Sequence, residues 1–404
     1  MLNRLIFIVF IFSHLLAASA LAAALPIPKP PSTGAKSFIV QDFESGRILA
    51  ENNSDQSVDP ASITKLMTAY VIFNELQAGN IALTDMVTIS EKAWRTPGSR
   101  MFVEVNKQVS VEDLLQGMII QSGNDATVAL AEHIAGSEET FAALMSRHAE
   151  EIGMTGSHFI NSTGLPDENH YMTARDIARL ATLLIRKYPE YYHWYSQKEF
   201  TFNEITQYNR NKLLWRDESV DGLKTGFTDS AGYCLVTSAK KDGMRLITVV
   251  LGTANANTRV DASQALLNYG FRFFETHKLY DAGTRLTTSR IWKGSTDSVP
   301  LGLDQALYVT IPRGQYKSLD ASMSIDQLIT APVREGQALG RRRVELRRVK
   351  RIGAVFLVAV VSPGKHVTHI HIAIAVVVLA RDLVKLDVFI GRVGFFDIAA
   401  LVAV

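Results

Sequence analysis

The feature that most constrains the fold is a change of hydrophobic period part-way along the chain. Apolar residues recur at helical spacing over 111–134 and again over 173–185, and from Gly222 onward they fall in short β-rich runs. Two of these runs, 233–239 and 245–251, flank the turn sequence Lys-Lys-Asp-Gly and predict a hairpin. A further helix is predicted over 263–275, after the hairpin. A helix-rich stretch followed by hairpin-linked strands indicates an α/β chain.

The first 24 residues are typical of an export signal. Arg4 supplies a positive start, an apolar run begins at Leu5, and Ala20-Leu21-Ala22 fits a cleavage site. An uncleaved membrane anchor remains an alternative, because the apolar run is nearly long enough to span a bilayer. Residues 25–35 form a proline-rich spacer. Both alternatives place the body outside the cytosol, and we expect the periplasm, with the outer face of the inner membrane as a second location.

Charge and cysteine content exclude some classes of partner and of fold. The 42 Lys and Arg nearly balance the 40 Asp and Glu, so charge gives no reason to expect nucleic-acid binding. Cys234 is the only cysteine and cannot form an intramolecular disulfide. We interpret it as a small buried apolar residue.

Three short polar motifs occur in order along the chain. They are Ser62-x-x-Lys65, Ser122-x-Asn124 and Lys224-Thr225-Gly226. Each motif alone is weak evidence, but the ordered set is strong. A serine hydroxyl needs a neighbouring base to act as a nucleophile, and residues i and i+3 share one face of a helix. Lys65 is therefore placed to activate Ser62.

The sequence before the first serine predicts where its helix begins. Asp59 is a suitable N-cap and Pro60 a suitable first helical residue, which puts Ser62 in the first turn. The positive end of the helix dipole would then favour negative charge developing near the serine.

This motif set resembles the penicillin-recognising serine enzymes. The flanking sequence narrows the likeness to the low-molecular-mass penicillin-binding proteins that are serine-type D-alanyl-D-alanine carboxypeptidases. The segments that carry it are DPASITKLMT at 59–68, NSTGLP at 161–166, VDGLKTG at 220–226 and GFRFFE at 270–275. The resemblance covers residues 36–340.

The resemblance implies a fold, a domain plan and an activity. We expect a catalytic domain at 36–275 of the β-lactamase and transpeptidase type, with a helical subdomain and an antiparallel sheet, and a small all-β domain at 276–340. The expected reaction removes the terminal D-alanine from peptidoglycan pentapeptide stems through an acyl-enzyme on Ser62. β-Lactams would acylate the same serine. No metal or organic cofactor is implied, and no nucleic acid.

The resemblance also implies a role for each site residue. Ser62 is the nucleophile, Lys65 its base, with a pKa lowered by burial and by Lys224, and Ser122 relays a proton to the leaving amine. Asn124 holds the substrate amide, and the backbone N–H groups of Ser62 and Phe227 form the oxyanion hole. The residues expected to line the site and bind the substrate's terminal carboxylate are Lys224, Thr225, Gly226, Arg259 and Arg210.

Two alternatives stay open from the sequence. A class A β-lactamase shares the nucleophile helix and the Lys-Thr-Gly motif but needs a water-activating carboxylate, and no E-x-x-L-N segment matches. A non-catalytic wall-binding module would retain the fold without the nucleophile, and the intact Ser62 and Lys65 argue against it. Accompanying endopeptidase activity and the oligomeric state are not determined by the sequence.

Residues 341–404 differ from the rest of the chain. The segment is rich in valine and contains no Asn, Gln, Tyr, Trp, Met or Cys. The amphipathic C-terminal helix that binds the membrane surface in the family is not found, and the apolar runs at 352–361 and 370–380 are too short to span a bilayer. We interpret the segment as an altered reading frame, with a genuine divergent extension as the alternative.

Overall fold

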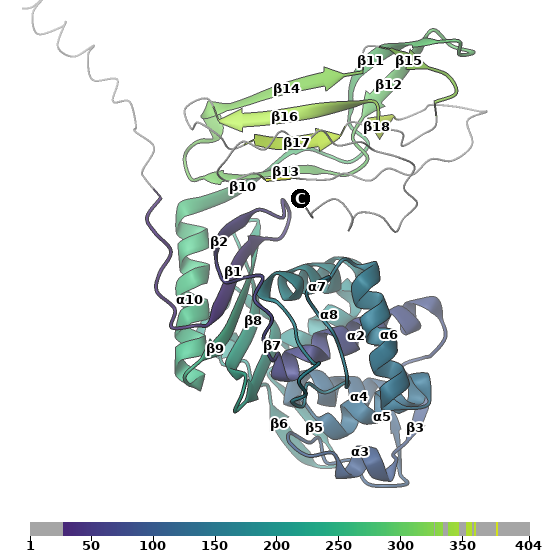
Figure 1. The fold of residues 1–404 in the computed structure, drawn as a ribbon, viewed down its shortest axis with the longest axis vertical. Coiled ribbons are helices and arrows are strands. Elements are labelled where there is room, and N and C mark those ends of the chain that lie inside the picture. The colour runs from purple at the N-terminus through teal and green to yellow at the C-terminus, as the bar shows by residue number, and fades with distance from the viewer. Residues whose placement is uncertain are drawn as a thin grey trace, which may run out of the picture.

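The computed structural model describes residues 27–326, 328–333, 338–346, 353–357, 359–360 and 377–378. The export signal and most of the tail beyond residue 346 lie outside these ranges. A mixed helix-and-sheet domain forms one part of the molecule and a strand-rich domain lies beyond its end (Figure 1). The spacer from residue 27 to residue 35 has no regular secondary structure.

A five-stranded antiparallel sheet organises the first domain. Its strand order is β2-β1-β9-β8-β7. The strands are β1 (Ser37–Asp42), β2 (Ile48–Asn52), β7 (Val220–Thr228), β8 (Gly232–Lys241) and β9 (Met244–Thr253). The predicted hairpin is confirmed as β8 and β9. Its two-residue turn is Asp242-Gly243, both with positive φ, which suits the right-handed twist of paired strands.

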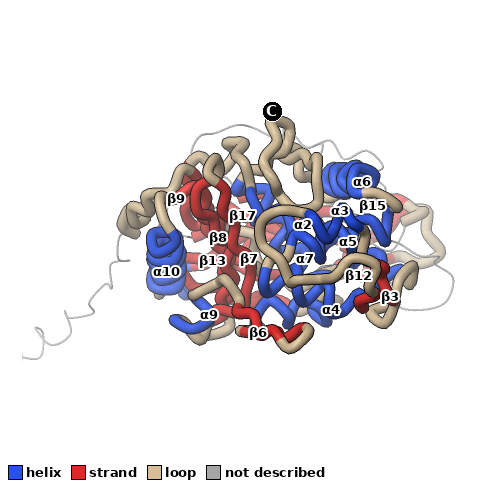
Figure 2. The backbone as a smooth tube through the Cα atoms, turned by 90° about the horizontal axis from the view of Figure 1, so that it is seen from below, coloured by secondary structure: helices blue, strands red, loops and turns tan. Residues whose placement is uncertain are grey.

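The helices cover both faces of this sheet (Figure 2). One face carries the helical subdomain, whose main elements are α2 (Lys65–Ala78), α4 (Val111–Gln116), α5 (Asn124–Ala135), α6 (Glu138–Glu151) and α7 (Ala174–Lys187). Helix α10 (Ala256–Phe273) covers the other face. A helix was expected only from residue 263. It begins earlier because the Asn255 side chain accepts hydrogen bonds from the N–H groups of Asn257 and Thr258.

Shorter elements complete this domain. They are η1 (Ala61–Thr64), β3 (Met86–Thr88), α3 (Glu91–Arg95), β4 (Gln108–Ser110), η2 (Gly117–Gln121), α8 (Pro189–Tyr192), η3 (His193–Ser196), β5 (Glu199–Phe202), β6 (Ile205–Tyr208) and α9 (Leu213–Arg216). Strands β3 and β4 form one hairpin-like pair, and β5 and β6 form another.

The alternation of side chains along the central strands divides the core in two. Val236 and Val249 face the helical subdomain, whereas their neighbours Leu235 and Val250 face α10. Successive residues of a strand point to opposite faces, so a sheet with helices on both sides needs continuous apolar runs. Cys234 is fully buried with a free thiol, as predicted.

The second domain consists mainly of strands. They are β10 (Phe274–Tyr280), β11 (Arg285–Trp292), β12 (Ser298–Gly302), β13 (Leu307–Pro312), β14 (Leu319–Ile325), β15 (Ile329–Thr330), β16 (Gly340–Leu346), β17 (Gly353–Leu357), β18 (Ala359–Val360) and β19 (Val377–Val378), with the short η4 (Tyr316–Ser318). Strand β16 pairs along its length with β14, so pairing continues past residue 340. In the described ranges no helix has the length and apolar character needed to cross a bilayer.

Candidate active site

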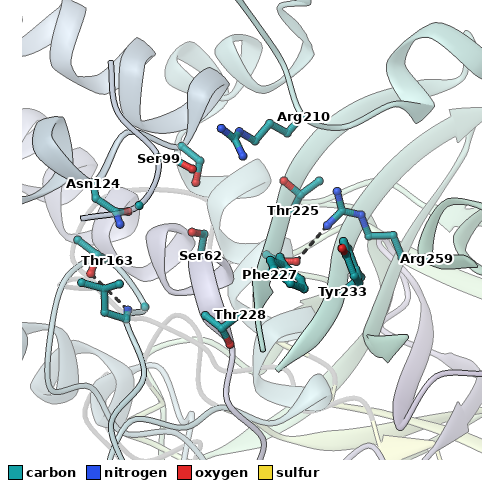
Figure 3. A pocket seen from close by; sticks show the side chains of 15 residues that line it. Ser62, Ser99, Asn124, Thr163, Arg210, Thr225, Phe227, Thr228, Tyr233 and Arg259 are labelled. Atoms are coloured by element: carbon teal, nitrogen blue, oxygen red, sulfur yellow. Dashed lines mark hydrogen bonds between the residues drawn. The ribbon is translucent and has the colours of Figure 1, made fainter. Parts of the chain in front are cut away.

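A cleft of about 500 Å³ lies between the helical subdomain and strand β7. All three sequence motifs contribute to it, and the Ser62 hydroxyl lies near its centre (Figure 3). The lining residues are Ser62, Gly98, Ser99, Ser122, Asn124, Thr163, Gly164, Leu165, Arg210, Thr225, Gly226, Phe227, Thr228, Tyr233 and Arg259. None of these is Asp or Glu.

Ser62 lies on a tight turn ahead of its helix. The predicted α-helix from Pro60 begins instead as the 3-10 helix η1, and α2 starts at Lys65. The cause is Ala61, whose φ of 48° is left-handed and cannot belong to an α-helix. The expected pairing nevertheless forms, since Lys65 Nζ donates to Ser62 Oγ at 3.2 Å.

Lys65 is buried and fully engaged by oxygen acceptors. Its ammonium nitrogen also donates to Asn124 Oδ1 at 2.6 Å and to the Thr163 carbonyl at 2.7 Å. Burial, with the positive charge of Arg210 as the next largest cause, lowers the pKa of Lys65 to about 7. The expected cation was Lys224. The dominant electrostatic neighbour is Arg210, and an amine with this pKa can serve as a base at neutral pH.

Ser122 and Lys224 form a second hydroxyl and amine pair. The helix leading into the second motif ends in the π-helical turn η2, and Ser122 follows it in a left-handed conformation with φ 67°. Lys224 on β7 donates to Ser122 Oγ at 2.8 Å. Burial lowers the pKa of Lys224 well below its ordinary value, and the charges of Lys65 and Arg210 add to this effect.

Asn124 begins α5 and joins the two walls of the cleft. Its carbonyl oxygen accepts from Lys65, and its amide nitrogen donates to the Pro97 carbonyl at 2.6 Å. An asparagine side chain has two donor hydrogens and two acceptor lone pairs. One of each therefore remains for a substrate amide.

The two arginines predicted from the sequence occupy different positions. Arg259 is 8% exposed, and its Nη1 donates to the carbonyls of Gly226 at 3.0 Å and Cys234 at 3.4 Å. Arg210 is exposed at the rim, where its Nε donates to the Gln121 carbonyl at 3.0 Å (Figure 3). Arg259 is thus fixed to backbone, whereas most of the Arg210 guanidinium is free to meet an anion.

Part of the cleft wall was not predicted. The loop that presents Gly98 and Ser99 is held by Asp125, whose carboxylate accepts from the N–H groups of Met101 at 2.9 Å and Phe102 at 2.9 Å. The Pro-Gly pair at 97–98 predicts a turn, but it does not predict that this turn lies at the cleft. This contact depends on the tertiary fold.

The segment 161–165, which the resemblance had marked without a role, forms another part of the cleft wall, beside Asn124 (Figure 3). Asn161 Oδ1 accepts from the N–H groups of Thr163 at 3.1 Å and Gly164 at 2.7 Å, and these hydrogen bonds hold the segment as a turn. His170 supports it as a structural residue, with Nε2 2.8 Å from Thr64 Oγ1 and Nδ1 accepting from the Ile160 N–H. Burial lowers the pKa of His170 to about 4, so its imidazole is neutral at pH 7.

A protein-family model described as D-alanyl-D-alanine carboxypeptidase matches residues 25–255. The chain belongs to this family. A second model, the C-terminal domain of penicillin-binding protein 5, matches residues 274–360. This carboxypeptidase is therefore a serine hydrolase with a transpeptidase-like catalytic domain and a strand-rich second domain.

Curated relatives and solved structures agree with this assignment. The chain is 47% identical to D-alanyl-D-alanine carboxypeptidase DacC of Escherichia coli over 337 residues, 81% of this chain and 84% of the relative. It is 43% identical to DacA of the same organism over 79% of this chain and 81% of that protein. The structure of penicillin-binding protein 5 from Haemophilus influenzae superposes with a TM-score of 0.78 at 42% identity, covering 82% of this chain and 98% of that one.

The match to the second model bears on the C-terminal boundary. The family resemblance seen in the sequence ends at residue 340, whereas the similarity to the second family model continues to residue 360. Strand β16 begins at Gly340 and pairs with strands β14 and β17 of the second domain. The altered reading frame stays a prediction, and residues 361–376 and 379–404, where it would have most effect, lie outside the described residues.

Proposed function

We propose that Ser62, Lys65 and Ser122 carry out the hydrolysis of D-Ala-D-Ala peptides by this carboxypeptidase, with peptidoglycan pentapeptide stems as substrates. The observation that carries the proposal is the position of Lys65. Its nitrogen lies 3.2 Å from the Ser62 hydroxyl in a site that lowers the pKa of the amine to about 7. A substantial fraction of Lys65 is therefore neutral at physiological pH and can accept the serine proton.

Acylation follows from these contacts. Lys65 Nζ takes the proton as Ser62 Oγ bonds to the carbonyl carbon of the penultimate D-alanine. The carbonyl oxygen becomes an oxyanion between the backbone N–H groups of Ser62 and Phe227. Donors of this kind each contribute ~3 kcal/mol to the stability of a transition state.

Collapse of the tetrahedral intermediate breaks the carbon–nitrogen bond and needs a proton for the leaving amine. Ser122 is placed to donate it, because its hydroxyl lies 2.8 Å from the Lys224 nitrogen, which can replace the proton. D-Alanine leaves, and water attacks the acyl-enzyme to restore Ser62. In this second step the proton taken by Lys65 returns to the serine, and the proton lost by the attacking water passes through Ser122 to restore Lys224.

Recognition of the free carboxylate is the task of the cations around the cleft. Arg210 and Arg259 line it, and Lys224 lies beneath Thr225. A surface with two guanidinium groups and no lining carboxylate attracts an anionic peptide end. Arg210 has the freer guanidinium, so we propose that it contacts the carboxylate directly while Arg259 fixes the strand that carries Thr225 and Gly226.

β-Lactams would acylate Ser62 in the same way and leave slowly. Penicillin-Binding Protein D2 from Listeria monocytogenes, whose structure has an ampicillin-bound form, superposes on this chain with a TM-score of 0.55 at 29% identity. The class A β-lactamase alternative requires a carboxylate that activates water beside the acyl group. The lining residues of this cleft include none.

The location and membrane contact of the enzyme are also part of the proposal. Residues 1–24 have the pattern of an export signal, and peptidoglycan lies outside the cytosol. We therefore place the enzyme in the periplasm, where it would act in cell-wall biogenesis and the maintenance of cell shape. Peripheral association with the inner membrane would depend on the C-terminal segment.

Substitution of the nucleophile tests the proposal. Ser62→Ala should abolish both D-alanine release from a pentapeptide and covalent labelling by fluorescent penicillin, and the thermal unfolding temperature should stay near that of the wild type. Ser196→Ala, which removes an exposed hydroxyl outside the lining of the cleft, controls for loss of a small polar group. Labelling that persists in Ser62→Ala would refute the assignment.

A further inference from the structure

Asp59 joins the nucleophile turn to the end of strand β7. Its Oδ1 accepts from the Ala61 N–H at 2.9 Å, and its Oδ2 accepts from Thr228 Oγ1 at 3.0 Å and from the Ser230 hydroxyl. We call these contacts the Asp59 clip. One carboxylate thus ties together two segments that are 169 residues apart.

The two segments are already in close backbone contact. A Cβ added to Gly226 would lie 2.9 Å from the Pro60 carbonyl oxygen and 3.2 Å from Ala61 Cβ. On its other side, Ala61 faces Gly164, where an added Cβ would lie 1.8 Å from the Ala61 carbonyl oxygen. Ala61 is therefore enclosed by two segments. Each segment can approach it so closely only because the residue at the contact is a glycine, which has no side chain.

Ala61 holds an unfavourable conformation within this enclosure. Its φ of 48° lies in the left-handed region, which alanine avoids, and the residue is fully buried. A strained conformation persists only where the surrounding structure fixes it, and such positions cluster at functional sites. The hydrogen bond from the Ala61 N–H to Asp59 is one of the contacts that fix it here.

The clip spans the two backbone donors of the proposed oxyanion hole. Ala61 directly precedes Ser62, and Thr228 directly follows Phe227. We infer that Asp59 is a positioning residue that sets the separation between the Ser62 N–H and the Phe227 N–H. The inference rests on the oxyanion role proposed for these two groups. Its catalytic effect would come through geometry alone, since Asp59 is not among the residues that line the cleft.

The expected effect is large because oxyanion-hole geometry acts on the transition state. Loss of one such donor lowers kcat by ~10² to 10³-fold. Asp59→Asn keeps the size of the side chain but replaces the carboxylate by a neutral amide, whose hydrogen bonds to the Thr228 and Ser230 hydroxyls are weaker than the charge-assisted ones. A displaced rather than absent donor should lower kcat by ~10 to 100-fold and change KM by less than ~3-fold.

The experiment compares variants of the clip with a matched aspartate elsewhere. Asp217 makes the same kind of contact, since it accepts from Ser219 in its own loop and from Gln264 on α10. Wild type, Asp59→Asn, Thr228→Val and Asp217→Asn are assayed for kcat and KM with a peptide ending in D-Ala-D-Ala, and for thermal unfolding. We expect kcat to fall in the two clip variants and to be unchanged in Asp217→Asn, even where the unfolding temperatures fall equally.

A boronic acid provides the readout that a merely structural role would not change. A peptide boronic acid ending in a D-alanine analogue forms a tetrahedral adduct with Ser62, and one boron-bound oxygen occupies the oxyanion hole. Asp59→Asn should weaken its binding by ~10-fold or more, in parallel with kcat, while KM for the peptide stays nearly constant.

Three results separate the outcomes. Normal kcat and boronate affinity in both clip variants would overturn the inference and leave the proposed function intact. An equal loss of kcat in Asp217→Asn would overturn it as well, because the effect would then be general. If wild-type enzyme released no D-alanine and took no penicillin label, the proposed function itself would fail. If Asp59→Asn does not fold, Ser230→Ala, assayed in the same way, decides between the first two results, because its hydroxyl belongs to the clip but not to the cleft lining.

Discussion

The low pKa of Lys65 makes the rate of acylation depend on pH in a defined direction. Only the neutral amine can take the Ser62 proton, and the folded protein lowers the pKa from an ordinary value of 10.5 to about 7. The rate should therefore rise with pH, reach half its plateau near pH 7, and fall about tenfold for each unit below that point. At pH 6 roughly a tenth of the plateau rate remains, and at pH 5 roughly a hundredth.

The physical cause of the shift predicts how a substitution moves the profile. Burial is the main cause, and the positive charge of Arg210 is the next. Removing that charge with Arg210→Gln should raise the pKa of Lys65 and move the midpoint to higher pH. Arg216→Gln is the matched control, because Arg216 is half-exposed and paired with Asp261 away from the cleft lining.

The assay is stopped-flow acylation by a fluorescent penicillin between pH 5 and 9, at constant ionic strength because exposed charges are screened by salt. Circular dichroism at each pH checks that the protein stays folded. A profile that is flat from pH 5.5 to 8.5, or a midpoint near the ordinary lysine value, would refute Lys65 as the base. An equal shift in Arg216→Gln would refute the assignment of the effect to local charge.

Four further substitutions and one control substitution test other parts of the site. Lys65→Ala should remove penicillin labelling on the seconds-to-minutes scale, and near-normal labelling would exclude Lys65 as the base. Arg210→Ala should impair peptides with a free terminal carboxylate far more than amidated analogues, whereas Arg259→Ala should impair both alike, and equal losses in kcat/KM for Arg210→Ala would assign that residue to general catalysis or folding. Gly164→Ala should lower the free energy of unfolding by ~3 kcal/mol or more, because its Cβ would lie 1.8 Å from the Ala61 carbonyl oxygen. Gly79→Ala is the control, since it has open space around it, and should lower the free energy of unfolding by only ~1 kcal/mol. Urea unfolding measures both.

The parts of the fold that follow from local chemistry could be predicted. The two apolar runs of the β8–β9 hairpin and the Asp-Gly turn between them are consecutive in the sequence, so local patterns predict the hairpin. Helix α7 was expected from residue 173, and Thr173 is its N-cap, with a side chain that accepts from the Asp176 N–H. Helix α10 was placed seven residues too late, because its first turns are capped by Asn255 and have a weaker apolar pattern.

The candidate site could be predicted where its residues share a motif, but not where the fold alone brings them together. Lys65 and Ser62 are three residues apart, so helix geometry predicts their contact. The influence of Arg210 on Lys65 depends on a loop whose position no local pattern specifies. The same is true of Ser99, which reaches the cleft because Asp125 on helix α5 holds the residues that follow it, Met101 and Phe102.

The glycine of the Lys-Thr-Gly motif shows how a short motif can encode a tertiary contact. Lys224 and Thr225 have side chains that can bind or transfer a proton, whereas Gly226 has none. Its function is to let β7 pack directly against the nucleophile turn, since a Cβ there would come within 2.9 Å of the Pro60 carbonyl oxygen. Close packing brings the backbone N–H of the next residue, Phe227, toward Ser62. The motif therefore combines two polar side chains with a glycine, and the absence of a side chain at the glycine lets the strand that carries them pack against the nucleophile turn.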